Sequence, residues 1–229
     1  MNRGPVPAAR DETSSWRLLD LLQLVDSGFP SGAYAHSFGL EWLQAQDSFD
    51  LEALLRARLS DAVAELELPL LRVAYQAEDV SRLVELDGLM DVLTPVREFR
   101  LASRSVGRGF LRAAVKVRPG GLPERTADAG VEHQPVVFGV VVRHWDVPLM
   151  EGLAAYAMQA VRQQLTAAQR LGRISQSVVQ ELLEALKPAI RRAVGRSLRV
   201  LPEEAGSFSP WFDLAGMRHE RQFARLFLS

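Results

Sequence analysis

Cysteine is absent from this chain of 229 residues, and lysine is nearly absent. Without cysteine the chain forms no disulfide, uses no catalytic thiolate and binds no iron–sulfur cluster or cysteine-ligated zinc. Of the 27 basic residues 25 are arginine, and the only lysines are Lys116 and Lys187. A phosphate-binding P-loop requires the pattern G-x-x-x-x-G-K-[ST], and neither lysine follows a glycine. The chain therefore does not bind GTP or ATP through a P-loop.

A charge excess and long apolar runs are also missing. The chain carries 27 basic and 28 acidic residues, so no strong overall field draws it to nucleic acid or to an anionic membrane. Its purest apolar run, 135–142, falls well short of the roughly 20 residues that a membrane-spanning helix needs. Residues 1–13 lack the apolar core of a secretory signal. We expect them to form a disordered lead and the protein to be cytoplasmic.

The sequence does contain helical periodicity along most of its length. From Trp16 to Val25 the apolar residues come close to the i, i+3, i+4, i+7 pattern, and residues 51–63 repeat it behind Asp50, a favourable N-cap residue. Further helices are expected over about 32–46, 94–117, 148–170 and 175–196. The sequence therefore predicts an all-α protein, with a single domain of roughly eight to ten helices over residues 14–212 and a C-terminal tail over 213–229.

Two segments between these helices need separate interpretation. Residues 118–135 hold three prolines and three glycines, which predicts a loop. Residues 136–142 are rich in valine, and propensity alone favours a buried strand. No other segment alternates convincingly enough to pair with such a strand. We therefore predict a fully buried helix here.

Neither a metal site nor a catalytic nucleophile is indicated. The four histidines belong to no H-x-x-x-H or H-E-x-x-H motif. His133 and His144 would share a helix face, but at a separation of roughly 16 Å they are too far apart to bind one ion. Ser37, beside His36, lacks the G-x-S-x-G elbow of a nucleophilic serine. We predict no catalytic residue and no permanent metal site, while a transient site shared between chains stays open.

Arginines recur at helical spacing in the middle of the chain, at Arg97, Arg100, Arg104, Arg108 and Arg112. Like charges four residues apart destabilise a helix by about 0.2–0.5 kcal/mol per pair, so this face must be solvated or matched by acidic groups. Internal ion pairs are one interpretation, and docking of a protein partner is the other, since arginine is enriched at interfaces. Nucleic-acid binding is disfavoured because the net charge of the chain is close to zero.

The tail combines apolar and basic residues after a loop rich in glycine, serine and proline. It contains Leu214, Met217, Phe223, Leu226 and Phe227 together with Arg218, His219, Glu220, Arg221 and Arg225. Such a segment either packs on its own domain or becomes ordered when it binds a partner. Composition alone does not decide between these two possibilities.

Four blocks of sequence, in order along the chain, closely resemble the urease accessory protein UreF family. The first runs through LLQLVDS (21–27) and FPSGAYAHSFGLE (29–41). The others are SRSVGR (103–108), HQPVVFG (133–139) and the end of the chain from MRHE (217–220) to RLF (225–227). Each block alone would be weak, but together they cover essentially the whole chain.

This resemblance implies an all-α homodimer that assists nickel incorporation into apo-urease. It implies binding to UreD (also called UreH), to the GTP-hydrolysing protein UreG and to apo-urease, with no enzymatic activity of its own. GTP would be bound by UreG, and nickel would pass at most transiently. The alternative reading of the chain is a helical protein that binds a small ligand, or an enzyme of unknown substrate.

The resemblance also implies roles for particular residues. The partner and dimer interface, with a route for nickel, would be formed by Pro30, Gly32, Tyr34, His36, Ser37, Gly39 and Glu41. The mid-chain arginine face would be centred on Arg104 and Arg108. The docking surface of the tail would be formed by Arg218, His219, Glu220 and Arg225.

Overall fold

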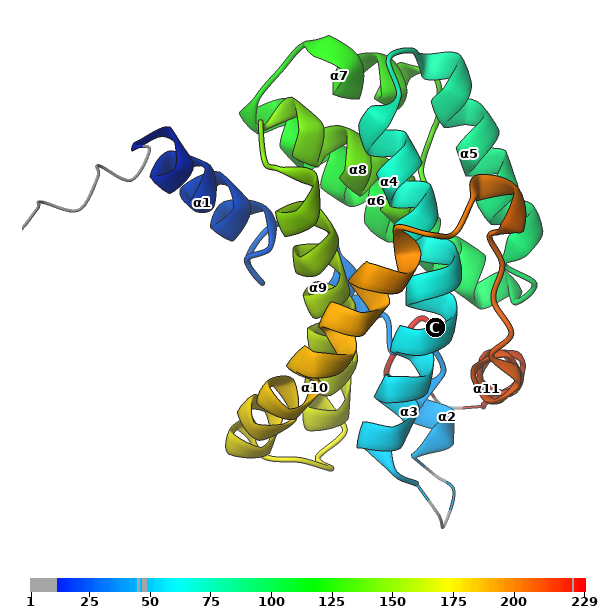
Figure 1. Ribbon diagram of the computed structural model, residues 1–229. Coiled ribbons are helices and arrows are strands. Elements are labelled where there is room, and N and C mark those ends of the chain that lie inside the picture. Colours follow the sequence, from blue (N-terminus) through cyan, green and yellow to red (C-terminus); the bar gives the residue numbers. More distant parts are fainter. Residues whose placement is uncertain (1–11, 45, 47–48, 224) are drawn as a thin grey trace, which may run out of the picture.

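The computed structural model describes residues 12–44, 46, 49–223 and 225–229, and this part of the chain folds almost entirely into helices (Figure 1). No strand occurs in the described residues, so the all-α prediction is confirmed. Residues 1–11 of the expected lead over 1–13 lie outside the described residues, and α1 begins at Glu12. The first half contains α1 (Glu12–Leu24), η1 (Ala33–Ala35), α2 (Leu40–Leu43), α3 (Leu51–Arg58), η2 (Leu59–Glu67), α4 (Leu68–Gln76) and α5 (Val80–Leu93). The second half contains α6 (Arg97–Val117), α7 (Gly121–Asp128), α8 (Gln134–His144), α9 (Leu149–Arg170), α10 (Gln176–Ser197), η3 (Pro202–Glu204) and α11 (Pro210–His219).

Side-chain caps begin several helices where the sequence indicates them. Asp50 accepts a hydrogen bond of 3.0 Å from the Ala53 N–H at the start of α3, and the Ser175 hydroxyl accepts one from Val178 at the start of α10. Each cap satisfies a backbone donor that has no partner inside the helix. Both predicted helix starts are thereby confirmed.

The helices α3, η2 and α4 follow one another without a break, and the middle portion is π-helical. Pro69, near the start of α4, has no N–H to donate to the Glu65 carbonyl four residues earlier. That carbonyl instead accepts a hydrogen bond of 3.0 Å from Gly206 N–H, in the loop before α11. The wider π-helical turn thus accommodates the proline without a break in the rod formed by α3, η2 and α4. The free carbonyl also links this rod to the loop before α11.

Helix α8 forms the centre of the core, and all its residues from Gln134 to Val142 are buried. It packs against both α4 and α6, the two helices with which it makes most of its contacts. Gly139 permits the approach to α4, because a Cβ there would lie 2.4 Å from the Leu71 carbonyl oxygen. The prediction of a fully buried helix at 136–142 is confirmed. Its neighbours within the described residues are helices, so it has no strand there with which to pair.

Two expected boundaries are wrong. The loop predicted over 118–135 contains α7, because Gly120 and Gly121 turn the chain with positive φ and Pro123 falls in the first helical turn, where no N–H is needed. The helix predicted over 32–46 is instead divided into η1 and α2. The division occurs at Phe38 and Gly39, whose φ angles of 52° and 77° are incompatible with a continuous helix.

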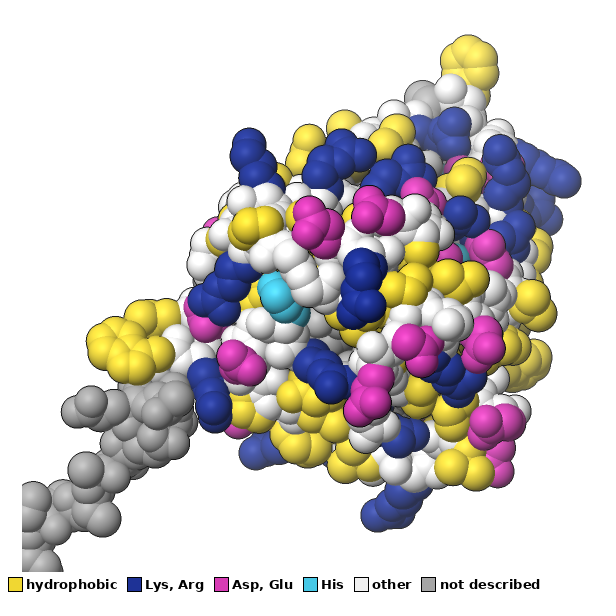
Figure 2. All heavy atoms as spheres, turned by 90° about the horizontal axis from the view of Figure 1, so that it is seen from above, with side chains coloured by type: hydrophobic (Ala, Val, Ile, Leu, Met, Phe, Trp, Pro, Cys, Tyr) yellow, Lys and Arg dark blue, Asp and Glu magenta, His cyan; other side chains and the backbone are white. Residues whose placement is uncertain are grey.

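The last part of the chain lies against the helical body. Helix α11 runs across the expected boundary between residues 212 and 213 and packs against α2 and α6. No helix of the described residues combines the length and apolar character needed to cross a membrane. On the face shown in Figure 2, basic and acidic side chains are interspersed with apolar ones.

Candidate docking site

The C-terminal segment is held by the side chain of Glu41, which follows the loop over 30–39. Glu41 Oε1 accepts a hydrogen bond of 2.8 Å from Leu226 N–H, and Oε2 accepts one of 3.1 Å from Phe227 N–H. Oε2 also lies 3.0 Å from Nε2 of His219, at the end of α11. One carboxylate therefore joins the start of α2 to both halves of the tail.

His219 lies between two carboxylates. Its Nδ1 is 2.8 Å from Glu98 Oε2 on α6, on the opposite side of the ring from Glu41, and the imidazole is completely buried. Each ring nitrogen therefore lies within hydrogen-bond distance of a carboxylate oxygen. Arg225 donates to the second oxygen of Glu98 at 2.8 Å. These four side chains contact one another in one cluster, which we call the tail clasp (Glu41, Glu98, His219 and Arg225).

The surroundings of Glu41 shift its pKa in two opposite directions. Burial raises the pKa of Glu41, whereas the backbone N–H groups of Leu226 and Phe227 and the ring of His219 lower it. The lowering contributions outweigh burial, so the pKa of Glu41 lies below its usual value. The carboxylate form that holds the tail is therefore favoured by the tail itself.

A second set of contacts joins the end of the tail to residues 35–37. Ser37 donates from both its N–H and its hydroxyl to the main-chain oxygen of Ser229, each at 2.7 Å, and Leu228 N–H donates to the Ala35 carbonyl at 2.9 Å. His36 Nδ1 lies 2.9 Å from the Ser229 hydroxyl. Burial lowers the pKa of His36, which favours the neutral ring. Residues 35–41 and 225–229 therefore form one continuous unit.

Two glycines shape the loop, for different reasons. Gly32 and Gly39 both have positive φ, 79° and 77°. A Cβ on Gly32 would meet nothing within 4 Å, so only the backbone turn requires glycine there. A Cβ on Gly39 would lie 2.9 Å from Ala215 Cβ, so this glycine also lets α11 approach. Pro30 and Tyr34 lie at the surface, and the Tyr34 side chain is 73% exposed.

Arg104 and Arg108 lie on α6 and form internal ion pairs. Glu132 binds Arg108 through both carboxylate oxygens, at 2.7 and 3.0 Å, and accepts from Arg104 Nε at 3.0 Å. Arg104 also contacts Asp91 at 3.0 Å, and Asp91 in turn lies 3.0 Å from His133 Nε2. This is the arrangement that the ion-pair interpretation of the arginine stripe predicts. These residues form a cluster of their own and make no contact with Glu41.

The predicted tail residues differ in what they present to solvent. Arg218 is exposed, and Glu220 is exposed and pairs with Arg97 of α6 at 2.9 Å. His219 faces inward, and Arg225 lies partly exposed above Glu98. Exposed apolar side chains surround them, at Trp211, Leu214, Met217, Phe223, Leu226 and Leu228. The surface of the tail is therefore both basic and apolar.

Among the described residues, no group of three or more His, Asp or Glu side chains is arranged to hold a metal ion. The clasp brings together two carboxylates and one imidazole, but the imidazole is occupied by hydrogen bonds on both sides. His36 has a hydroxyl partner on Nδ1. A metal bound by His219, or by Nδ1 of His36, would first have to displace these partners.

Comparisons with known proteins agree with the resemblance seen in the motifs. The family model described as UreF matches residues 45–187. The chain is 37% identical over 219 residues to the urease accessory protein UreF of Arthrobacter sp. (strain FB24), covering 92% of this chain and 96% of that protein. It is 33% identical over 234 residues to the urease accessory protein UreF of Bradyrhizobium sp. (strain ORS 278), covering 99% and 98%.

The chain belongs to the UreF family of urease accessory proteins. The predicted family is thereby confirmed, as is the expectation of an accessory protein rather than an enzyme. The UreF model match includes Arg104 and Arg108 but ends before the tail and begins after the loop over 30–41. The alignment with the Bradyrhizobium UreF extends over both of these regions, since it covers 99% of the chain.

The acidic partners in this UreF-family chain are what sequence reasoning missed. Glu98 pairs with His219 and Arg225, and Glu132 with Arg104 and Arg108, yet neither carboxylate was predicted as a site residue. The sequence indicated only that the five arginines at helical spacing need solvent or acidic partners, without showing which acidic residues these are. Which acids meet them depends on the packing of α6 against residues 131–134 and α11, and spacing along the chain does not reveal it.

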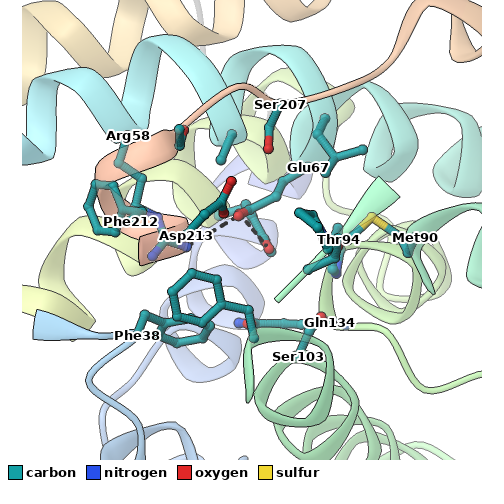
Figure 3. A pocket seen from close by; sticks show the side chains of 17 residues that line it. Phe38, Arg58, Glu67, Met90, Thr94, Ser103, Gln134, Ser207, Phe212 and Asp213 are labelled. Atoms are coloured by element: carbon teal, nitrogen blue, oxygen red, sulfur yellow. Dashed lines mark hydrogen bonds and ion pairs between the residues drawn. The ribbon is translucent and has the colours of Figure 1, made fainter. Parts of the chain in front are cut away.

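A central cavity bears on the small-ligand alternative for this UreF-family chain (Figure 3). It holds about 70 Å³ and lies between η2, α11 and the start of α6, with Arg58 bound to Glu67 at 3.2 Å and Tyr156 donating to Glu67 at 3.0 Å. Burial raises the pKa of Asp213, which also lines it. Sites for drug-sized ligands usually have volumes of roughly 300–1,000 Å³. This cavity suits a few water molecules and does not favour the alternative.

Proposed function

We propose that this UreF-family chain is an adaptor that assists nickel incorporation into apo-urease by bridging UreD/UreH, UreG and the apoenzyme. It acts as a homodimer in the cytoplasm and makes or breaks no bonds itself. GTP is bound by UreG, and nickel is cargo that passes transiently. Family membership supports the role in urease maturation, and the lack of a P-loop in the sequence agrees with a nucleotide held by a partner.

The observation that carries the adaptor proposal is the tail clasp. Through Glu41 the loop and the C-terminal segment become one surface, although they lie at opposite ends of the sequence. Exposed apolar side chains border it on both parts, with Tyr34 on the loop and Leu226 and Leu228 on the tail. Exposed apolar patches with an arginine-containing rim are typical of protein interfaces. UreD and UreG dock on this surface in our proposal.

The residues predicted for docking then divide into two groups. Arg218, Glu220 and the exposed edge of Arg225 contact partners directly. His219 is buried, so His219 and Glu41 act indirectly, by holding the tail in position through their hydrogen bonds.

The nickel route proposed along residues 30–41 leads past Pro30, Gly32 and Tyr34 at the surface to His36, Ser37, Gly39 and Glu41 inside. Imidazole and carboxylate are ligand types that nickel accepts. The tail engages the Glu41 carboxylate and Nδ1 of His36 in this structure, so nickel that binds either of these groups must displace the tail.

Co-purification tests the docking assignment. The chain carrying Arg225→Ala is expressed with UreD and UreG and recovered through an affinity tag on UreD. We expect UreG to be lost from the complex while far-UV circular dichroism stays unchanged. Arg82→Ala is the control, since Arg82 lies on α5 and, within the described part of the chain, forms its ion pair with Glu85 of the same helix. Retention of UreG by the Arg225 variant at the control level would contradict the docking assignment.

Urease activation tests the role of nickel at His36. Cells lacking the chain are complemented with the wild type or with His36→Ala over a series of nickel concentrations. We expect the variant to fall behind at limiting nickel and to recover at high nickel. Full activation at limiting nickel would assign His36 to packing alone. Normal urease output from uncomplemented cells would overturn the adaptor function itself.

A further inference from the structure

A groove with an arginine rim lies between η2 and the C-terminal half of α10, well away from the tail clasp. In Figure 1 this half of α10 crosses in front of the bundle towards the rod formed by α3, η2 and α4. The groove has a volume of about 490 Å³. Its charged lining consists of Arg56, Arg192, Arg196 and Arg199, and none of the described acidic residues lines it.

Small side chains create the groove. Ala189, Ala193 and Gly195 of α10 face Ser60 and Ala64 of η2, so the two helices approach each other without large residues to fill the surface between them. The alanines are buried and give the groove an apolar floor. A bound segment would therefore remove apolar surface from water at the floor while its polar groups meet the rim.

The positive charge of the rim is only partly matched within the chain. Arg56 is held by Glu52 at 2.6 Å, and Arg196 pairs with Glu65. Arg192 and Arg199 are exposed and have no acidic partner in the part of the chain that the structure describes. Arg192 and Arg196 are four residues apart and share one face of α10, and Arg199 lies in the turn just after the helix ends at Ser197; all three line the groove.

The helix dipole explains only part of this arrangement. Basic residues in the last turn of a helix gain about 0.3–1 kcal/mol each from the carbonyl end, and Arg196 lies in the last turn of α10. The dipole effect falls off within that turn, so it does not account for Arg192. Nor does it account for the placement of Arg56 on another helix beside the same groove.

We infer that this groove binds an acidic segment of a protein partner, in which carboxylates spaced three or four residues apart on a helix meet Arg192, Arg196 and Arg199. Guanidinium groups bind carboxylates in a bidentate geometry. The apolar floor of the groove accepts the small side chains that lie between the carboxylates of the bound segment. Single-stranded nucleic acid fits less well, because its bases need aromatic stacking platforms and no described aromatic residue lines the groove. This surface is separate from the tail clasp and does not depend on the roles proposed for the tail.

A direct binding measurement tests the inference. The probe is a short fluorescein-labelled helical peptide with glutamates at i, i+3 and i+7 on one face and alanines elsewhere. Its fluorescence anisotropy is followed during titration with the full chain. We expect Arg192→Glu combined with Arg199→Glu to weaken binding at least about tenfold. The control combines Arg112→Glu with Arg125→Glu, which makes the same charge change at exposed arginines elsewhere, and it should leave binding within about twofold of the wild type.

Charge exchange supplies the second measurement. A peptide with arginines in place of the glutamates should bind the Arg192→Glu and Arg199→Glu chain better than it binds the wild type. Equal thermal melting temperatures of the two double variants show that both are folded. The inference is overturned if the acidic peptide does not bind the wild type, or if both double variants lose it equally. It is also overturned if a uridine oligonucleotide binds more tightly than the peptide and is lost with the same substitutions.

Discussion

His219 and Glu41 are 178 residues apart in sequence and are joined by a hydrogen bond of 3.0 Å between Nε2 and Oε2. His219 is completely buried. The Glu41 carboxylate also accepts hydrogen bonds from two backbone N–H groups of the tail. Loss of the Glu41 charge would therefore weaken three contacts at once. For this reason Glu41 is the position at which attachment of the tail can best be tested.

Glu41→Gln keeps the size of the side chain but removes its charge. Hydrogen bonds to charged groups contribute about 1.5–3 kcal/mol each, so we expect the free energy of unfolding to fall by about 2 kcal/mol or more. Cleavage by trypsin at Arg221 and Arg225 should become faster under native conditions. Urea denaturation and limited proteolysis measure the two effects. Glu220→Gln is the control, because its exposed pair with Arg97 is worth at most about 1 kcal/mol. Equal effects of the two substitutions would contradict a special role for Glu41.

Acid should detach the tail before the helical core unfolds. The pKa of Glu41 is lower in the folded chain than in the unfolded chain. Its stabilising contribution is therefore complete above the unfolded value and is lost as the pH falls through the folded value. We expect the difference in unfolding free energy between the wild type and Glu41→Gln to shrink as the pH is lowered below about 4.5. Urea denaturation at a series of pH values measures this difference, and a constant difference down to pH 3 would count against it.

Gly32→Ala and Gly39→Ala form a matched pair in one loop. Both positions have positive φ, where alanine costs about 1–2 kcal/mol relative to glycine. At Gly32 that backbone cost is the whole effect, because the new Cβ meets open space. At Gly39 the Cβ would also collide with Ala215 and push α11 away, so we expect a larger loss of stability. Thermal denaturation compares the two variants, and equal losses would contradict the close approach of α11.

Gly107→Ala and Gly88→Ala form a second pair, this time within helices. A Cβ at Gly107 would lie 1.9 Å from the Glu132 carbonyl oxygen, so α6 would have to move from the segment that pairs with Arg104 and Arg108. We expect a loss of about 1–3 kcal/mol. A Cβ at Gly88 meets nothing within 4 Å, and alanine there should raise stability by about 0.5–1 kcal/mol. Chemical denaturation of both variants checks the opposite signs.

Local patterns predicted the helices well where the physical cause is itself local. Asp50 and Ser175 begin helices because a side-chain oxygen can cap the backbone within three residues. The buried helix at 136–142 was predictable only by elimination, since its valines favour a strand. Its helical state depends on α4 and α6, which surround it. Helix α7, inside residues 118–135, was not predicted, because the number of glycines and prolines in a segment does not show their positions. Here they lie at and just before the start of the helix, where both residue types are tolerated.

The candidate site was predictable in part. The motifs indicated the loop over 30–41 and the tail as regions of interest, but they did not indicate that these regions touch. The stripe of arginines on α6 required acidic partners, yet their identity as Asp91 and Glu132 follows from the packing of three segments. His219 was expected at a docking surface, whereas the structure turns it inward to bind two carboxylates.

The sequence by itself determined the helical character, the absence of thiol and P-loop chemistry, and the family, because composition, periodicity and motifs are properties of neighbouring residues. Tertiary structure alone decided which charges meet. Glu41, Glu98 and the tail residues His219 and Arg225 come from three separate parts of the chain, and only the packing of α11 onto α2 and α6 brings them within hydrogen-bond distance. A buried charge is stable only beside its counter-charge, so the fold selects these partners in three dimensions where spacing along the chain cannot.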